Sequence, residues 1–326
     1  MDDFDQGLAN VVERFAADAS DVDRDESLPL EHLTLLADLG LYGAFAPVNE
    51  GGLGFGMSEL CSAVEVLAAA CLASTFVWIQ HLRLLASVLD GDASELLLGL
   101  KDRVIRGEVK GGVALAGLLP GPPRLRATPT PVGWTLDGSA PWVSGWGIVD
   151  ELFVAARGPD DTVVNVLVAP REQNGLSAQR LEMSAINATS TVALTFDSFV
   201  VDHTHVVSEI SYEAAQGGGV GLRLNGSLAL GVTRRCCTLI GESLLDAELS
   251  EAREVLDNAD AETMPQARAR ASELAARAAS TLCTHRGSSS VLRGDIAERT
   301  AREATLLLAF GSRPAIRAAL LAYLQE

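Results

Sequence analysis

The chain has 326 residues, 48% of them hydrophobic, and a formal net charge of -18 at pH 7. This length exceeds what one ordinary hydrophobic core contains, so we expect two or three domains. The negative charge argues against nucleic acid and anionic membrane surfaces as partners, because both would repel the protein. The apolar runs fall far short of the roughly 20 residues that cross a bilayer, and the acidic N-terminus is unlike a signal peptide. We therefore expect a cytoplasmic protein without membrane insertion.

The first part of the chain, residues 1–110, is expected to be a helical domain, because apolar residues recur there at helical spacing. Gly40 stands where a helix would end with a left-handed glycine, and a glycine-rich loop follows at residues 41–54. Ser58 is a suitable N-cap for the next helix. Helices are predicted over residues 5–17, 31–39, 58–73, 75–89 and 93–106.

The pattern changes near Gly111, and residues 111–207 are expected to form a middle β domain. Short alternating segments are separated by turns at residues 157–161 and 172–175. Several short strands at this spacing favour an antiparallel barrel or sandwich. Strands are predicted over residues 124–130, 133–137, 151–156, 162–168, 176–180 and 192–201.

The last part, residues 208–326, is expected to be a C-terminal helical bundle. Pro314 is placed at a first helical turn, where its missing N–H costs nothing. Helices are predicted over residues 222–239, 244–256, 266–284 and 296–310, and from Pro314 onward. The fold class is therefore an α+β multidomain protein of helices, β-barrel or sandwich, and helices. Strands and helices do not alternate as in a Rossmann domain.

The cysteines, Cys61, Cys71, Cys236, Cys237 and Cys283, are odd in number and have no spacing suited to a metal. Each lies in an apolar helical context, which predicts reduced, buried thiols. A redox pair at Cys236 and Cys237 is the alternative, but adjacent cysteines rarely form a disulfide.

A tryptophan and a serine two residues apart stand out in the β region, at Trp142 and Ser144. On one face of a strand, an indole and a hydroxyl would form a platform for a flat ligand. This strand and two further motifs resemble the acyl-CoA dehydrogenase family of flavoproteins, over nearly the whole chain. The family pattern G-L-x5-P-x3-G-G-x-G is matched by Gly40-Leu41, Pro47, Gly51-Gly52 and Gly54. The family's strand pattern G-x3-W-I-T/S is matched by Gly138, Trp142, Val143 and Ser144. The family's closing R-D-A pattern, which follows a Glu, is matched by Glu298 and Arg302-Glu303-Ala304.

The resemblance implies the fold described above, with FAD lying between the middle and C-terminal domains. Trp142 would lie against the isoalloxazine ring. Val143, the next residue of the strand, would also belong to the cofactor-binding segment. The hydroxyl and backbone of Ser144 would bond near N5 and O4 of the flavin. A hydrogen-bond donor there stabilises the negative charge that arrives with a hydride. The alternative is an aromatic core strand whose serine faces solvent.

The sequence departs from the family where the rest of the flavin would bind. In the loop at residues 116–123, only Gly121 of the flavin-binding pattern remains, and Pro122 and Pro123 have no N–H for a phosphate. The helical hairpin after Cys237 is shortened, so the arginine of its tip is missing. On the adenine side, one glycine remains at Gly287.

The carboxylate base that the family uses is also missing. Acyl thioester dehydrogenation needs a base that takes the α-proton while the flavin takes the β-hydride. The family's two places for this glutamate fall at Gly311 and near Gly221. Glu298 and Glu303 are expected instead to pair with neighbouring arginines at helical spacing. We therefore predict no catalytic residue in this chain and no dehydrogenase activity of the chain alone.

The histidines offer no substitute chemistry. His81 is expected to be a core histidine, and His285 a helix-end residue beside a polar serine loop that lacks a nucleophile elbow. His203 and His205 would need a third partner to hold a metal, and the sequence provides none.

Three functions remain open at this stage. The first is the base-lacking subunit of a heteromeric, FAD-dependent acyl-CoA dehydrogenase that acts on an acyl-CoA-type substrate. Its partner would be a second dehydrogenase-like chain; self-association as a dimer or tetramer is the other arrangement. The second is an autonomous flavoenzyme of the same fold, such as a hydroxylase. The third is a flavin-free scaffold.

Overall fold

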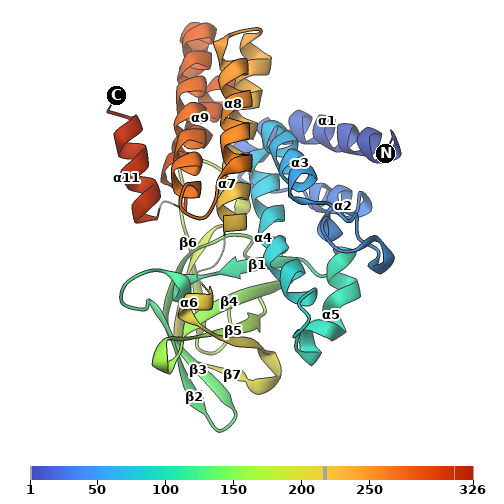
Figure 1. Ribbon diagram of the computed structural model, residues 1–326, viewed down its shortest axis with the longest axis vertical. Coiled ribbons are helices and arrows are strands. Elements are labelled where there is room, and N and C mark those ends of the chain that lie inside the picture. Colours follow the sequence, from blue (N-terminus) through green and yellow to red (C-terminus); the bar gives the residue numbers. More distant parts are fainter. Residues whose placement is uncertain (1, 216–218, 312, 326) are drawn as a thin grey trace.

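The computed structural model describes residues 2–215, 219–311 and 313–325, and it has the predicted order of helices, sheet and helices (Figure 1). In the N-terminal part, α3 packs against α7 of the C-terminal bundle, and α4 packs against the strand β1. These helices therefore connect the sheet to the bundle. Their bounds are α1 (Asp2–Asp25), α2 (Leu30–Asp38), α3 (Met57–Ala70), α4 (Leu72–Val88) and α5 (Glu95–Ile105).

Local sequence explains most of these helix ends. Gly40 follows α2 with a φ of 77°, a left-handed conformation that glycine adopts without a steric penalty. Ser94 caps α5, since its hydroxyl accepts the backbone N–H of Leu97. The predicted cap at Ser58 is wrong: α3 begins at Met57, and Gly56 with its extended backbone occupies the N-cap.

The middle region is one eight-stranded sheet with the order β6-β7-β3-β2-β4-β5-β8, and β1 pairs with β4 off this path. The long antiparallel pair of β3 and β7 lies next to the β6 edge of the sheet. The bounds are β1 (Gly111–Ala114), β2 (Leu125–Thr130), β3 (Gly133–Val143), β4 (Glu151–Arg157), β5 (Thr162–Val168), β6 (Leu176–Arg180), β7 (Val192–Asp202) and β8 (Val206–Ser211).

The sheet is mixed, whereas the sequence predicts only antiparallel strands. β1 runs parallel to β4, and β2 meets β4 in parallel at a single residue pair. Between β1 and β4, the chain forms the antiparallel hairpin of β2 and β3. After this hairpin, β4 runs in the same direction as β1. β3 joins the strand predicted at residues 133–137 to the strand segment that carries Trp142, across a register shift near Gly138, whose φ is 124°.

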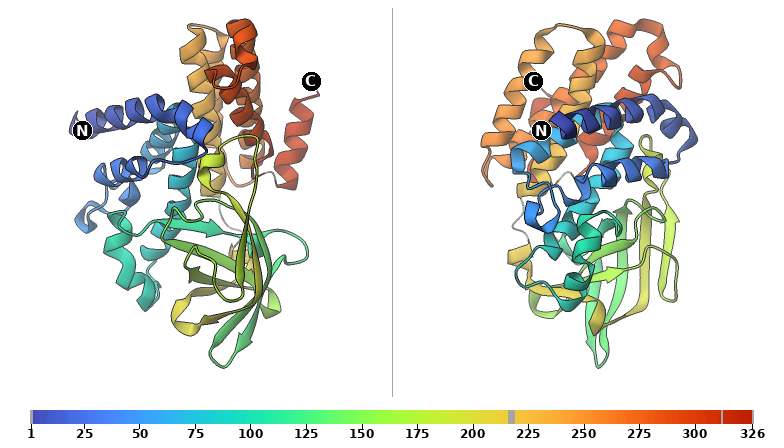
Figure 2. Two further views of the ribbon diagram at one scale, coloured as in Figure 1. Left: turned by 180° about the vertical axis from the view of Figure 1, so that it is seen from behind. Right: turned by 90° about the vertical axis from the view of Figure 1, so that its right-hand side faces the viewer.

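Helices α7, α8, α9 and α10 stand beside one another above the sheet, whereas the short α6 lies beside β5 and β8 (Figures 1 and 2). Their bounds are α6 (Tyr212–Ala215), α7 (Gly219–Ile240), α8 (Leu244–Asn258), α9 (Met264–Arg286), α10 (Ile296–Ala309) and α11 (Pro314–Tyr323). α7 approaches α3 closely at Gly231, where a Cβ atom would lie 2.6 Å from the carbonyl oxygen of Glu65. Only glycine permits this approach, so the small residues of α7 join the bundle to the N-terminal helices.

A continuous hydrophobic core runs through the N-terminal helices, the sheet and the bundle. A separate small cluster of Ala269, Ile316 and Leu320 attaches α11 to α9. Within the described ranges, no helix is both long enough and apolar enough to span a membrane. The domain boundaries at residues 110 and 207 stay predictions.

Candidate functional site

Trp142 lies at a β-bulge near the end of β3. Ala140 is opposite Leu194 of β7 and Val143 is opposite Val192, so β3 has one extra residue in this interval. Trp142 has a φ of 63° and its side chain is 66% exposed. A bulky residue rarely adopts this backbone conformation, and such strain is concentrated at functional sites. The bulge therefore presents an indole to the solvent.

Val143 and Ser144, the next two candidate residues, are buried. The Ser144 hydroxyl lies 2.7 Å from the hydroxyl of Thr191, which lies 2.8 Å from the hydroxyl of Thr189. The expected common face of Trp142 and Ser144 is interrupted, because the bulge turns the indole outward while the serine bonds inward. The sequence alternation alone contains no signal for this bulge.

The loop that carries Gly121 leads into β2 beside the middle of β3. β2 begins at Leu125, opposite Gly138, and the backbone N–H of Ser139 donates to the carbonyl of Arg124. Gly121 has a φ of 90°. The loop therefore reaches β3 at Gly138 and Ser139, three to four residues before Trp142.

A buried arginine, Arg157, holds the first part of this loop. Its Nε and Nη2 donate to the carbonyl oxygen of Gly117 over 3.2 and 3.0 Å. Its guanidinium carbon lies 3.4 Å from the ring centre of Tyr212, and Nη1 donates to Asp161 over 3.0 Å. The sequence analysis missed Arg157, because its partner is 40 positions away in the chain.

Gly287, the remaining candidate, follows α9 in the helical bundle with a φ of 69°. The neighbouring Arg286 donates to Asp295 over 2.8 Å. Because this ion pair occupies part of the Arg286 guanidinium, fewer of its N–H groups could bind a phosphate. Gly287 is 145 positions from Trp142 in the chain, and a Cβ atom on Gly287 would meet open space.

The two places of the missing base lie on neighbouring elements. A Cβ atom on Gly311 would lie 3.5 Å from the side-chain nitrogen of Asn225 on α7. Gly221 precedes Asn225 by one helical turn, and a Cβ atom there would meet open space. An amide, not a carboxylate, therefore stands nearest to Gly311.

The carboxylates of α10 are tied to arginines. Glu303, 5% exposed, accepts a hydrogen bond from Arg235 and lies 3.8 Å from Arg299. Burial would lower the pKa of Arg235, but the Glu303 carboxylate outweighs it and raises that pKa. Glu298 pairs with Arg302 at 2.6 Å, as predicted. Neither carboxylate is free to act as a base.

His81 lies in the core as expected, but it is not fully satisfied, because its Nε2 has no hydrogen-bond partner among the described residues. His81 is buried, its Nδ1 accepts the N–H of Gly111 over 3.0 Å, and burial lowers its pKa to about 3. His203 and His205 lie in a short turn before β8. Across the described residues, no three metal-ligating side chains gather.

The cysteines are free thiols, and four of them are buried. Burial raises the pKa of Cys236 to about 12 and that of Cys237 to about 11. These thiols are therefore protonated near neutral pH and are poor nucleophiles. The predicted burial is confirmed for four thiols, whereas Cys283 is half-buried, and the reduced state of the thiols stays a prediction.

The described residues could bind only part of a flavin molecule. The exposed indole of Trp142 offers a face for the ring, and Gly121 lies on an adjoining loop. Pro122 and Pro123 provide no N–H for the phosphates, and the Ser144 hydroxyl is engaged with Thr191. The described residues thus make an incomplete flavin site, and the cofactor-binding roles stay predictions.

Comparisons with known proteins agree with this fold. The family model for the acyl-CoA dehydrogenase N-terminal domain matches residues 3–96. L-evernosamine nitrososynthase of Micromonospora sp. is 29% identical over 72% of this chain and 56% of its own length. Benzylmalonyl-CoA dehydrogenase of Aromatoleum aromaticum is 26% identical over 68% of this chain and 62% of its own length. The chain thus spans less than two thirds of these curated relatives.

Solved structures match over a larger part of the chain. Butyryl-CoA dehydrogenase from Megasphaera elsdenii superposes with a TM-score of 0.82 at 18% identity, covering 100% of this chain and 98% of that one. Dibenzothiophene monooxygenase from Paenibacillus sp. A11-2 superposes with a TM-score of 0.77 at 17% identity, covering 98% of this chain and 96% of that one. At these identities the likeness shows the fold alone.

Proposed function

We propose that this chain, which belongs to the acyl-CoA dehydrogenase family, is the base-lacking subunit of a heteromeric, flavin-dependent acyl-CoA dehydrogenase. The main support for this proposal comes from the residues at the two base positions and from the hydrogen bonding of the carboxylates on α10. Glycines occupy both positions, and Glu303 and Glu298 of α10 are bound to arginines. Proton abstraction from an acyl thioester then requires a carboxylate from a second chain.

The end of β3 would be this chain's contribution to the shared site. FAD, when bound, supplies the acceptor for a hydride. Trp142 would cover one face of the ring and exclude water from it, and Gly121 would let the loop backbone approach. Val143 and Ser144 hold the strand end in the core. The partner would provide the phosphate contacts that Pro122 and Pro123 cannot make.

Co-expression with a full-length dehydrogenase-like chain that carries the glutamate base tests this proposal. We expect the isolated chain to be colourless and inactive toward acyl-CoA substrates with an artificial electron acceptor. The co-purified complex should be yellow and active. Substituting the partner's base by glutamine should abolish that activity. Robust turnover by the isolated chain would contradict the proposal.

A second candidate is an autonomous flavoenzyme that needs no carboxylate base. The similarity to a protein called a nitrososynthase favours it. This function requires that the chain bind flavin alone. Stoichiometric flavin released by denaturing the isolated chain would therefore favour the second candidate over the first. A third candidate, a flavin-free scaffold, would leave both the chain and the complex colourless.

A further inference from the structure

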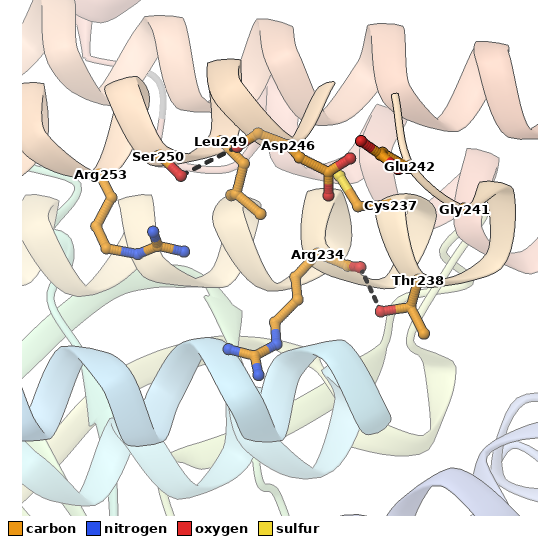
Figure 3. A pocket seen from close by; sticks show the side chains of 9 residues that line it. All are labelled: Arg234, Cys237, Thr238, Gly241, Glu242, Asp246, Leu249, Ser250 and Arg253. Atoms are coloured by element: carbon orange, nitrogen blue, oxygen red, sulfur yellow. Dashed lines mark hydrogen bonds between the residues drawn. The ribbon is translucent and has the colours of Figure 1, made fainter. Parts of the chain in front are cut away.

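A hollow of about 420 Å³ opens between α7 and α8 (Figure 3). Its volume is within the range of small-molecule sites. None of the candidate flavin residues and neither base position lines it. Its lining comes from the end of α7, the turn that follows, and α8: Arg234, Cys237, Thr238, Gly241, Glu242, Asp246, Leu249, Ser250 and Arg253.

A buried glutamate of α3 orients the two arginines of this hollow. Glu65 is 4% exposed and accepts hydrogen bonds from Nε and Nη2 of Arg253 over 3.0 and 2.7 Å. Nη1 of Arg234 lies 3.7 Å from Oε1 of the same carboxylate. Two guanidinium groups therefore share one carboxylate, and this group of three side chains keeps one positive charge.

Arg234 has unused hydrogen-bond donors. Its side chain is 48% exposed, and among the described residues it donates no hydrogen bond within 3.5 Å. Figure 3 shows the Arg234 and Arg253 side chains extending toward the same side of the hollow. A planar guanidinium carries five N–H donors that match phosphate or carboxylate oxygens. An anionic group near both arginines would balance their charge.

Two hydroxyl groups of the hollow could accept hydrogen bonds from a ligand. Thr238 donates its hydroxyl hydrogen to the carbonyl of Arg234 over 3.0 Å, and Ser250 donates to the carbonyl of Asp246 over 3.0 Å. Their oxygen atoms can still accept hydrogen bonds. A ligand that carries hydroxyl donors beside its anionic group would use both kinds of partner.

The carboxylates of the hollow lie near Cys237, away from Arg253 (Figure 3). Asp246 accepts the backbone N–H of Ser243 over 2.9 Å and so caps α8. The Cys237 thiol is uncharged at neutral pH, because burial raises its pKa to about 11. The anionic part of a ligand is therefore directed to the end of the hollow with the two arginines.

We propose that this hollow binds a small hydroxylated phosphate ester, with the phosphate at Arg234 and Arg253 and the hydroxyl groups at Thr238 and Ser250. The net charge of -18 opposes anion binding to the protein as a whole, so binding here depends on the two guanidinium groups. This site is independent of the flavin site, so its test does not depend on the proposed function.

Calorimetric titration of the full chain with glycerol 3-phosphate at low ionic strength tests the proposal. We expect saturable 1:1 binding, weaker binding of inorganic phosphate, and none of glycerol. Arg234→Gln should weaken binding at least about tenfold, because it removes the positive charge and the charge-assisted hydrogen bonds to the phosphate. Arg234→Lys should weaken binding less, because it keeps the charge but loses the planar fork.

Arg270→Gln is the matched control, because Arg270 is 37% exposed on α9, pairs with Glu251, and lies outside the hollow. It removes the same charge and should leave binding unchanged. The site is refuted if glycerol 3-phosphate does not bind saturably, or if both glutamine variants weaken binding equally. Equal affinity for inorganic phosphate and glycerol 3-phosphate would refute the hydroxyl contacts.

Discussion

Two regions of the molecule differ in how completely their polar and aromatic groups are bound by neighbours. One is the junction of α3, α7 and α10, and the other is the end of β3. At the junction, Arg235 donates to the carbonyls of Ala68 and Ala69 over 3.0 and 2.7 Å, to the Thr300 hydroxyl over 3.1 Å, and to Glu303. At the end of β3, Trp142 adopts a strained conformation and is 66% exposed. The scaffold is thus closed around its charges, whereas the candidate site is open.

This difference teaches that the fold and the site are stabilised separately. A buried arginine and glutamate depend on each other, because either one alone would be an uncompensated charge. An exposed indole contributes little to folding, since it remains in water. Substitutions at the junction should therefore affect stability, and substitutions at the strand end should affect ligand binding.

The largest effect is expected when the junction is broken. Glu303→Gln leaves the buried Arg235 without a countercharge and should lower the free energy of unfolding by about 3 kcal/mol or more. Urea unfolding measures this change. Glu298→Gln removes a more exposed carboxylate of the same helix, whose pair with Arg302 is 16% and 26% exposed. Equal losses in the two variants would contradict a special role for the buried pair.

A second test concerns His81 on α4, which accepts the N–H of Gly111 at the start of the sheet. Its pKa is about 3 in the folded protein against an ordinary 6.5, so below pH 6.5 the unfolded chain binds a proton that the folded chain does not. Stability should therefore fall as the pH drops from about 6.5 toward about 3. Between pH 7 and pH 5 this contribution is about 2 kcal/mol.

Replacing His81 isolates that contribution. His81→Asn should lose less stability than the unmodified protein between pH 7 and pH 5, as measured by denaturant unfolding at each pH. His285→Asn is the control, because His285 is exposed at the end of α9. An unchanged pH dependence in His81→Asn would show that His81 is not held neutral by burial.

A smaller effect is expected at the loop beside β3. Arg157→Gln removes the hydrogen bonds to the Gly117 carbonyl and the contact with Tyr212. The free energy of unfolding should fall by about 1–3 kcal/mol, and amide hydrogen exchange should increase in residues 115–123. Arg126→Gln, at an exposed position of β2, is the control. Unchanged exchange in the Arg157 variant would show that the loop is held by other contacts.

The smallest effect on stability is expected at Trp142. Trp142→Ala should change the free energy of unfolding by less than about 0.5 kcal/mol, because exposed substitutions have small effects. The same variant should retain less flavin in the assembled complex, measured by absorbance of the released cofactor. Val132→Ala, at an exposed turn, is the control. Unchanged flavin content would count against the site at the end of β3.

Most of the fold was predictable, because its signals are local. Helical spacing predicted the N-terminal and C-terminal helices, Gly40 and Pro314 marked helix ends, and Glu298 pairs with Arg302 four residues later. The antiparallel prediction for the sheet was incomplete, because strand direction depends on how the β2–β3 hairpin is placed between β1 and β4.

The sequence by itself determined the α–β–α order and the lack of a carboxylate at Gly311, since both follow from residue type and short-range spacing. Only the tertiary structure decided that Arg235 meets Glu303 across 68 positions and that Glu65 orients the arginines of the hollow. It also decided that the bulge turns Trp142 outward. Such contacts depend on which faces pack together, and local periodicity does not encode the partner.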